Sequence, residues 1–229
     1  MHFVSGSKFQ TFIHQYFHVP IKTFSEENFH SLCDKLAKKD KELRNIIQQY
    51  GYPPLWSREP TFATLIYIIL EQQVSLASAK AAFLKLQEKI GHIIPEKILL
   101  LSDEEMKACY FSRQKIKYAK HLASSMVNGE LSIGGLHLLT DEQIRTELKK
   151  INGIGDWTVD VYLMMVLHRC DCFPAGDVAL MKSLKEIKGL SLQTSKEKIL
   201  VIAGKWKPYR TVAAFLLWHA YIKKRNMKL

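Results

Sequence analysis

The sequence predicts an all-α protein with two helical lobes, and three observations support this fold class. Apolar residues recur at i, i+3, i+4 and i+7 through most of the 229-residue chain, which is the spacing of one face of an α-helix. Helix-capping residues stand at the starts of these periodic stretches, and Gly or Pro follows several of them. Mixed Phe, Val, Ile and Thr residues of strand type occur only in residues 1–22 and have no clear period. We therefore expect little or no β structure at the N-terminus.

The helices can be placed in order from their apolar period and their capping residues. A capping box of Thr23 and Glu26 is expected to start the first helix, and Gly51 is expected to end it. Ser75 is expected to cap a helix that Gly91 ends. The full set of expected helices comprises residues 26–50, 61–70, 76–90, one opening at Ser102, one starting at Arg113, one opening at Thr140, residues 157–168, one opening at Asp177, and residues 208–224.

The charge balance favours a polyanionic partner. Lysine and arginine number 33 against 22 aspartate and glutamate residues, which gives a formal net charge of +11 and a pI of about 9.4. Such an excess of positive charge attracts nucleic acid and makes its binding sensitive to salt. Charge alone carries no information about the fold, since many proteins are basic without binding DNA.

The cysteines and the apolar segments argue against several other classes of protein. None of the four cysteines forms a Cys-x-x-Cys pair, which argues against a zinc ribbon or an iron–sulfur cluster. The Cys170-Asp171-Cys172 segment is open to a metal or redox interpretation, but its apolar neighbours favour reduced thiols. The apolar run Phe62 to Leu70 is shorter than the roughly 20 residues that span a bilayer. We expect a soluble protein of the cytoplasm, associated with the nucleoid in a bacterium or located in the nucleus of a eukaryote.

A glycine-rich hairpin is the most informative segment of the chain. Gly153 and Gly155 flank Ile154 between two stretches with helical patterning. Glycine permits a turn with positive φ and removes the Cβ atoms that keep another backbone away. The next helix begins directly after the turn, so its free N–H groups and the positive end of its dipole face outward. We therefore expect Gly153, Ile154 and Gly155 to bind an anion such as a DNA phosphate.

A loop rich in Gly and Pro follows the hairpin and ends in a carboxylate. In Phe173-Pro174-Ala175-Gly176-Asp177 the aspartate stands at the start of the next predicted helix. Asp177 is then an N-cap, accepting from the N–H groups of Ala179 or Leu180. A catalytic role is compatible with the cap, because the cap would also fix the side chain. Asp171 is a weaker candidate, since it precedes the loop.

These motifs resemble those of one DNA glycosylase superfamily. Residues 148–157 and 173–177 are similar to its helix-hairpin-helix, Gly/Pro-rich loop and aspartate signature (HhH-GPD). The segment Ile69-Leu70-Glu71-Gln72-Gln73-Val74-Ser75 looks like the bacterial 3-methyladenine DNA glycosylase II branch. The resemblance runs from about residue 40 to residue 222 with short gaps. It implies one glycosylase unit over residues 1–229, with an extension at 1–25, a helical core at 26–229 and the helix-hairpin-helix at about 140–168.

The resemblance implies a monofunctional glycosylase that flips out alkylated bases of the 3-methyladenine and 7-methylguanine type. Cleavage of the N-glycosidic bond builds positive charge on the sugar, and a carboxylate such as that of Asp177 stabilises this charge. Related lyases carry a Schiff-base lysine where this chain has Trp157. The expected reaction is therefore hydrolysis that leaves an abasic site in base excision repair, with no required cofactor and no iron–sulfur cluster.

Aromatic residues are the expected walls of the base pocket. By resemblance, Trp157 and Trp218 match pocket residues, and an indole face attracts a cationic alkylated purine by about 0.5–2 kcal/mol. The alternative is that both tryptophans belong to the core. A further pocket aromatic of the family falls at Val161, so the adjacent Tyr162 is the remaining candidate.

The expected DNA contacts comprise a wedge and basic residues. By resemblance, Gln73 occupies the family's wedge position, where a residue inserts into the duplex in place of the flipped base. The alternative is that Gln73 is a polar turn residue. Gln72 is expected to support the turn. Arg113 and Lys115 are expected phosphate contacts within a basic cluster that also contains Lys117 and Lys120. A second cluster contains Lys205, Lys207 and Arg210, and either cluster is open to being a solvated face.

The resemblance further implies a site for Na+ or K+ at the hairpin, formed by the backbone carbonyls of Lys149, Ile151 and Ile154. The expected partner is double-stranded DNA that contains damaged bases, with no membrane, and the expected oligomeric state is a monomer.

Three alternatives remain open at this point. A glycosylase for a deaminated or oxidised base would share most of these motifs, and Val161 and Gln73 keep it open. A non-catalytic helix-hairpin-helix DNA-binding module would use Asp177 only as a cap. An endonuclease III-like lyase is disfavoured by Trp157 and by the absent cysteine cluster.

Overall fold

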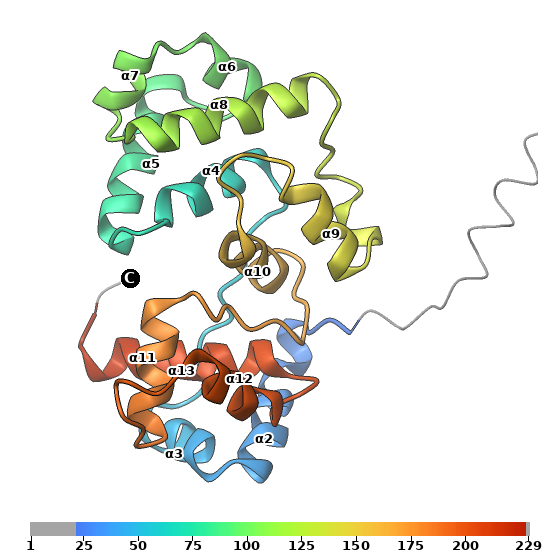
Figure 1. Ribbon diagram of the computed structural model, residues 1–229, viewed down its shortest axis with the longest axis vertical. Helices are drawn as coiled ribbons and strands as arrows, with labels where there is room; N and C mark the ends of the chain where they lie inside the picture. The colour runs from blue at the N-terminus through green and yellow to red at the C-terminus, as the bar shows by residue number, and fades with distance from the viewer. Residues whose placement is uncertain (1–21, 228–229) are drawn as a thin grey trace, which may run out of the picture.

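The computed structural model describes residues 22–227, and this part of the chain consists of α-helices and one short 3-10 helix without a strand (Figure 1). An isolated β-bridge joins Thr23 to Arg169. The prediction of an all-α fold is confirmed. The strand-like segment at residues 1–22 lies outside the described residues except for Lys22.

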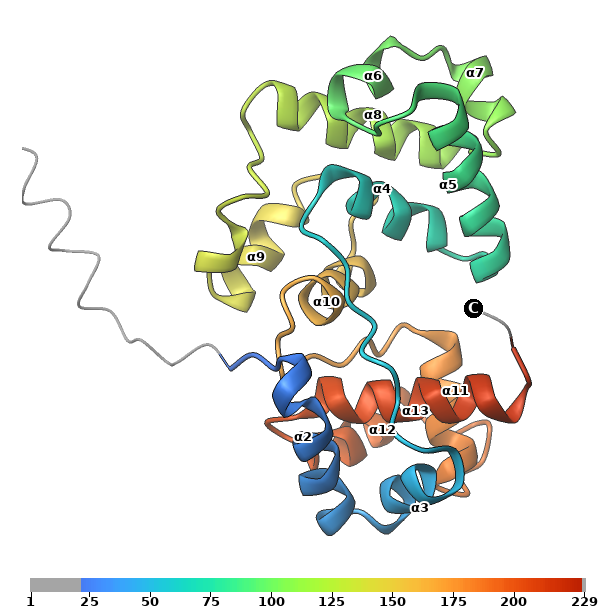
Figure 2. The same cartoon turned by 180° about the vertical axis from the view of Figure 1, so that it is seen from behind.

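The helices form two lobes on either side of α10 (Figures 1 and 2). The upper lobe in Figure 1 contains α4 (Phe62–Glu71), α5 (Leu76–Ile90), α6 (Pro95–Leu100), α7 (Asp103–Ala108) and α8 (Arg113–Val127). The lower lobe contains α2 (Glu26–Lys39), α3 (Lys41–Tyr50), α11 (Val178–Ile187), α12 (Lys196–Gly204) and α13 (Arg210–Lys224). The 3-10 helix η2 (Leu136–Leu138) and the helices α9 (Asp141–Leu148) and α10 (Asp156–Met165) lie between them. Figure 2 shows the linker at residues 51–61 passing along α10 from one lobe to the other.

Helix α13 is the centre of the lower lobe. Its residues from Thr211 to Ala220 are all buried, so it is enclosed on every side rather than amphipathic. It packs against α2, α3 and α11, which come from opposite ends of the described chain. Trp218, one of the expected pocket residues, therefore projects from the most enclosed helix of this lobe.

The prediction of a single helix at 26–50 is wrong, because the helix is interrupted at Asp40. The Asp40 carboxylate caps α3 by accepting from the N–H groups of Glu42 at 3.1 Å and Leu43 at 3.2 Å. It also binds Lys188 Nζ at 2.6 Å and Trp206 Nε1 at 2.8 Å. Burial works against the charge, yet these hydrogen bonds hold the pKa of Asp40 below its ordinary value. Contacts with residues far along the chain thus stabilise an interruption of the helix that the spacing of apolar residues does not predict.

Most other helix boundaries agree with the capping signals. Ser75, Ser102 and Thr140 each accept a backbone N–H at the start of a helix, and Gly91 ends α5 with φ 69°. The first capping box consists of Ser25 and Asn28 rather than Thr23 and Glu26. The last helix begins two residues after Pro208, and the helix expected at 157–168 ends at Met165. Within residues 22–227 no helix has the length and apolar character needed to cross a membrane.

Candidate active site and nucleic-acid interface

The hairpin between α9 and α10 has the geometry of an anion-binding turn. Ile154 N–H donates to the Ile151 carbonyl at 3.0 Å, which closes the turn, and Gly153 has φ +87°. Gly155 is the N-cap of α10 and provides no side chain to cap it. The first N–H groups of this ten-residue helix therefore remain available to an external acceptor.

The two hairpin glycines have different structural roles. A Cβ atom on Gly153 would lie 2.1 Å from the Tyr118 ring, because that ring packs directly on the hairpin backbone. Gly155 has an ordinary φ of −103°, and a Cβ atom there would meet nothing within 4 Å. Gly153 is therefore required by the turn and its packing, whereas Gly155 leaves open space in front of the helix N-terminus.

A carboxylate in the first turn of α10 is neutralised by its neighbours. Asp156 Oδ1 accepts from Lys149 Nζ at 2.9 Å and lies 3.9 Å from Arg145. The hydrogen bond from Lys149 lowers the pKa of Asp156, so this exposed side chain is charged but paired at neutral pH. The pairing weakens the repulsion that Asp156 would otherwise exert on a phosphate at the hairpin.

The backbone carbonyls expected to hold a monovalent cation lie in this hairpin. The Ile151 carbonyl accepts the hydrogen bond from Ile154 described above, and its second lone pair remains available for an ion. The carbonyls of Lys149 and Ile154 flank the same turn. The residues present are thus compatible with such an ion, and the site stays a prediction.

The loop before α11 presents Asp177 as the helix N-cap. Asp177 N–H donates to the Pro174 carbonyl at 2.8 Å, which closes the Gly/Pro-rich turn. The Asp177 Oδ1 atom accepts from Leu180 N–H at 2.7 Å, as the capping interpretation expects. The side chain is half-buried, so its carboxylate is fixed by the protein while remaining open on one side.

Both candidate pocket tryptophans donate to this carboxylate. Trp157 Nε1 lies 3.0 Å from Oδ2 of Asp177, and Trp218 Nε1 lies 3.1 Å from Oδ1. The structure thus brings together three residues that are separated by 20 and 41 positions in the chain. Three N–H donors, two of them from indoles, hold the carboxylate in one orientation.

Tyr162 is not part of this constellation. Its side chain has no exposed surface, and its hydroxyl has no hydrogen-bond partner within the part of the chain that the structure describes. Burial raises the pKa of Tyr162 to about 12. The role of Tyr162 in the base pocket stays a prediction, and burial of its side chain in the hydrophobic core argues against that role. Val161, where the family's aromatic would fall, is also buried.

Trp56 is an aromatic neighbour of the site that the sequence reasoning missed. This half-buried residue of the linker lies edge-on to Trp218, with ring centroids 6.4 Å apart and an interplanar angle of 77°. It also packs edge-on against Phe215 at 5.4 Å. No local pattern marks Trp56, since it stands in a linker between helices, far from Trp218 in the sequence.

Gln73 lies in the turn between α4 and α5. Its side chain is exposed, and its backbone has φ +57°, a left-handed conformation that non-glycine residues rarely adopt. The neighbouring Val74 and Leu76 are 45% and 43% exposed, so the turn offers apolar as well as polar side chains to a partner. Its wedge role stays a prediction.

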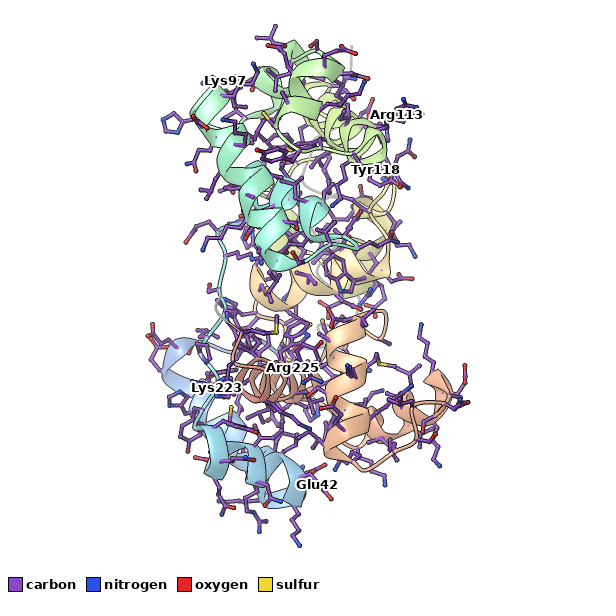
Figure 3. The ribbon with its side chains drawn as sticks, turned by 90° about the vertical axis from the view of Figure 1, so that its left-hand side faces the viewer. Glu42, Lys97, Arg113, Tyr118, Lys223 and Arg225 are labelled. Carbon is purple, nitrogen blue, oxygen red and sulfur yellow. The ribbon has the colours of Figure 1, made fainter. Side chains whose placement is uncertain are left out.

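The two basic residues singled out on α8 differ in their surroundings. Arg113 is exposed in the first turn of α8, and Figure 3 shows it on the same side of the upper lobe as Tyr118. Lys115 is half-buried, and its Nζ donates to the Leu70 carbonyl at 2.6 Å. Desolvation lowers the pKa of Lys115. The structure therefore directs Lys115 to the end of α4. Arg113 is exposed and pairs with no carboxylate among residues 22–227, so its phosphate contact stays a prediction.

One residue of the second basic cluster, Arg210, is also engaged in an ion pair within the protein. Arg210 donates from Nε to Asp171 Oδ1 at 2.8 Å and from Nη2 to Asp171 Oδ2 at 3.0 Å. This pairing gives Asp171 a structural role at the start of α13. In the first cluster, Lys120 Nζ is similarly paired with Asp103 Oδ1 at 2.6 Å.

These surroundings predict different responses of DNA binding to salt. Replacing Arg113 with Ala is expected to reduce the slope of log affinity against log salt concentration by about 1, because one phosphate contact is lost. Lys115→Met is expected to leave that slope unchanged and to lower the free energy of unfolding by about 1 kcal/mol, because the bond to Leu70 is lost. Binding isotherms at several salt concentrations and urea unfolding check this, and a reduced slope for Lys115→Met would contradict it.

The fold and the site define a base excision DNA repair protein of the helix-hairpin-helix class. The chain belongs to the HhH-GPD superfamily of base excision DNA repair proteins, whose family model matches residues 66–208. This span contains the turn that carries Gln73, the hairpin and Asp177, so the resemblance inferred from the motifs is confirmed.

Individual relatives are DNA-3-methyladenine glycosylases. The chain is 29% identical over 202 residues to that enzyme of Bacillus subtilis, a match that covers 80% of this chain and 65% of the relative. It is 29% identical over 191 residues to DNA-3-methyladenine glycosylase 1 of Schizosaccharomyces pombe, covering 80% and 83%.

Solved structures agree with this assignment. The Schizosaccharomyces pombe 3-methyladenine DNA glycosylase in complex with abasic DNA superposes with a TM-score of 0.73 at 29% identity, covering 82% of this chain and 95% of that chain. The DNA-3-methyladenine glycosidase of Bacillus halodurans gives a TM-score of 0.68 at 28% identity, covering 85% and 91%. A Clostridium acetobutylicum 8-oxoguanine glycosylase/lyase shares the fold at 18% identity, with a TM-score of 0.74 and coverage of 98% and 78%.

Proposed function

We propose that this protein is a monofunctional DNA glycosylase that excises alkylated bases of the 3-methyladenine and 7-methylguanine type. The observation that carries the proposal is the Asp177 carboxylate, which accepts three N–H donors, two of them from the indoles of Trp157 and Trp218. Relatives named as DNA-3-methyladenine glycosylases, at 29% identity, support the same assignment.

The proposed reaction begins when the hairpin and the first turn of α10 bind a phosphate of the damaged strand. The alkylated base leaves the stack, while Gln73 fills the gap in the duplex. The indole faces of Trp157 and Trp218 attract the cationic base, which is already activated as a leaving group. A Na+ or K+ ion held by the hairpin carbonyls would add positive charge beside the phosphate.

Asp177 then acts at the sugar. As the N-glycosidic bond breaks, its electron pair leaves with the base and positive charge develops on the sugar. The oriented carboxylate stabilises that charge and positions the water that attacks C1′, and the product is an abasic site. Trp157 occupies the first turn of α10, where an amine nucleophile would be needed for a lyase, so no covalent Schiff base is expected.

The test is release of 3-methyladenine and 7-methylguanine from methylated double-stranded DNA by the purified protein. We expect release of both free bases, an abasic product and no adduct with the protein after borohydride treatment. The same assay on duplexes with deaminated or oxidised bases separates the substrate classes. Release confined to those bases would overturn the alkylbase assignment, and binding without release of any base would support a non-catalytic module.

A further inference from the structure

The turn that carries Gln73 is fixed by three different elements of the fold. From α8, Lys115 Nζ donates to the Leu70 carbonyl at 2.6 Å. From the linker, the Arg58 guanidinium donates to both oxygens of the buried Glu71 carboxylate at 2.8 and 2.6 Å. The third attachment is Gln72, and it joins the turn to the phosphate-binding hairpin. These contacts act on three successive residues just before Gln73.

The side-chain amide of Gln72 connects the turn that carries Gln73 to the hairpin between α9 and α10, the two segments proposed to contact DNA. Its Nε2 donates to the Gly153 carbonyl at 2.8 Å and to Thr158 Oγ1 at 2.9 Å. An amide nitrogen has two hydrogens, so both of its donors are used. Thr158 is 1% exposed in the first part of α10, and the Gln72 side chain is itself half-buried. Gln72 was expected to support the turn, and it does so through residues that lie 81 and 86 positions further along the chain.

The conformation of Gln73 makes this attachment significant. A left-handed backbone at a non-glycine residue such as Gln73 is strained, and it persists only where the surroundings determine it. The peptide that leads into Gln73 belongs to Gln72, whose side chain is held by the hairpin. The direction in which Gln73 points is therefore tied to the position of Gly153 and α10.

We propose that Gln72 is a positioning residue that couples the wedge to the hairpin, so that phosphate binding and insertion of Gln73 occur as one rigid unit. The inference rests on the proposed function, because it concerns how that site flips a base. Without the bonds from Gln72, the hairpin still binds phosphate, but the turn that carries Gln73 loses its direct attachment to the hairpin and keeps only those to Lys115 and Arg58. The fraction of bound duplex with the base flipped out then falls.

The consequence is a defect that depends on the substrate. Excision from a duplex requires the base to leave its stack and its partner, whereas a lesion in single-stranded DNA has no partner and little stacking to lose. Gln72→Met keeps the size of the side chain and removes both donors. We expect it to lower the single-turnover excision rate about tenfold on duplex DNA and less than about twofold on the same lesion in a single strand.

A double-mutant cycle shows whether Gln72 acts through the wedge. Gln73→Ala is expected to give a similar duplex-selective loss, and the variant with both changes is expected to lose no more than Gln73→Ala alone. Thr158→Val removes one of the two acceptors without changing the shape of the residue, and its smaller loss is expected in the same direction. This variant provides the test if Gln72→Met does not fold.

The outcomes separate the coupling from a general structural role and from the proposed function. Equal losses on duplex and single-stranded DNA, or additive losses in the cycle, would overturn the coupling. Failure of the wild type to excise any base would instead reject the proposed function. If the wild type excises no base, the fluorescence of 2-aminopurine placed opposite an abasic analogue still reports insertion of Gln73 into the duplex. An unchanged signal in Gln72→Met would again reject the coupling.

Discussion

Asp177→Asn is expected to lower the rate constant for excision of an alkylated base by more than about 100-fold, equivalent to about 2.7 kcal/mol. The amide carries no negative charge to stabilise the developing cation. Its NH2 group would also face an indole N–H of Trp157 or Trp218, so one of the present hydrogen bonds is lost. Asn caps helices as well as Asp does, so α11 and the fold should persist.

Single-turnover excision and DNA-binding measurements on the folded variant check this expectation. Asp171→Asn is the matched control, because that carboxylate lies in the same connection and binds Arg210 instead of the indoles. We expect the control to excise bases within about threefold of the wild type. Full activity of Asp177→Asn would mean that Asp177 is only a helix cap, and it would favour another catalytic group.

Gly153→Ala is expected to destabilise the protein by about 2–4 kcal/mol. The left-handed conformation at φ +87° costs an alanine about 1 kcal/mol, and forcing a methyl group against the Tyr118 ring adds about 1–3 kcal/mol. The close contacts involve Cγ and both Cδ atoms of the ring, which cannot move aside as easily as the tip of a long side chain. Urea unfolding measures the change.

Two further variants separate the causes of this destabilisation. Gly155→Ala has ordinary backbone geometry and open space, so its stability should stay within about 1 kcal/mol of the wild type. Its methyl group would instead obstruct a phosphate, and we expect weaker DNA binding. In a Tyr118→Ala background the steric part of the Gly153→Ala cost should vanish. An equal cost in both backgrounds would contradict the packing explanation.

The features that the sequence predicted well depend on neighbours along the chain. Ser75, Thr140 and Asp177 cap helices because a short polar side chain reaches a backbone N–H three residues ahead. That geometry is local and needs no tertiary information. The positive φ at Gly153 is local in the same way, and the order of the motifs indicated the superfamily.

The features that were missed depend on contacts between distant residues. The break at Asp40 is stabilised by Lys188 and Trp206, which lie 148 and 166 positions further along the chain. The direction of Lys115, the burial of Tyr162 and the approach of Trp56 to Trp218 likewise follow from how helices pack. A periodic pattern shows which face of a helix is apolar, but it does not show which partner covers that face.

The enclosure of α13 also determines which part of the site can be redesigned. Trp218 projects from a helix whose residues from Thr211 to Ala220 are all buried, so replacing it would disturb the packing of the whole lobe. Trp157 is tied to Asp177 in the same manner as Trp218. Trp56 is half-buried in a linker and contacts Trp218 by its ring edge. A combinatorial library aimed at new lesion specificities should therefore randomise Trp56 before Trp218, because variation in the linker costs less folding stability than variation in the enclosed helix.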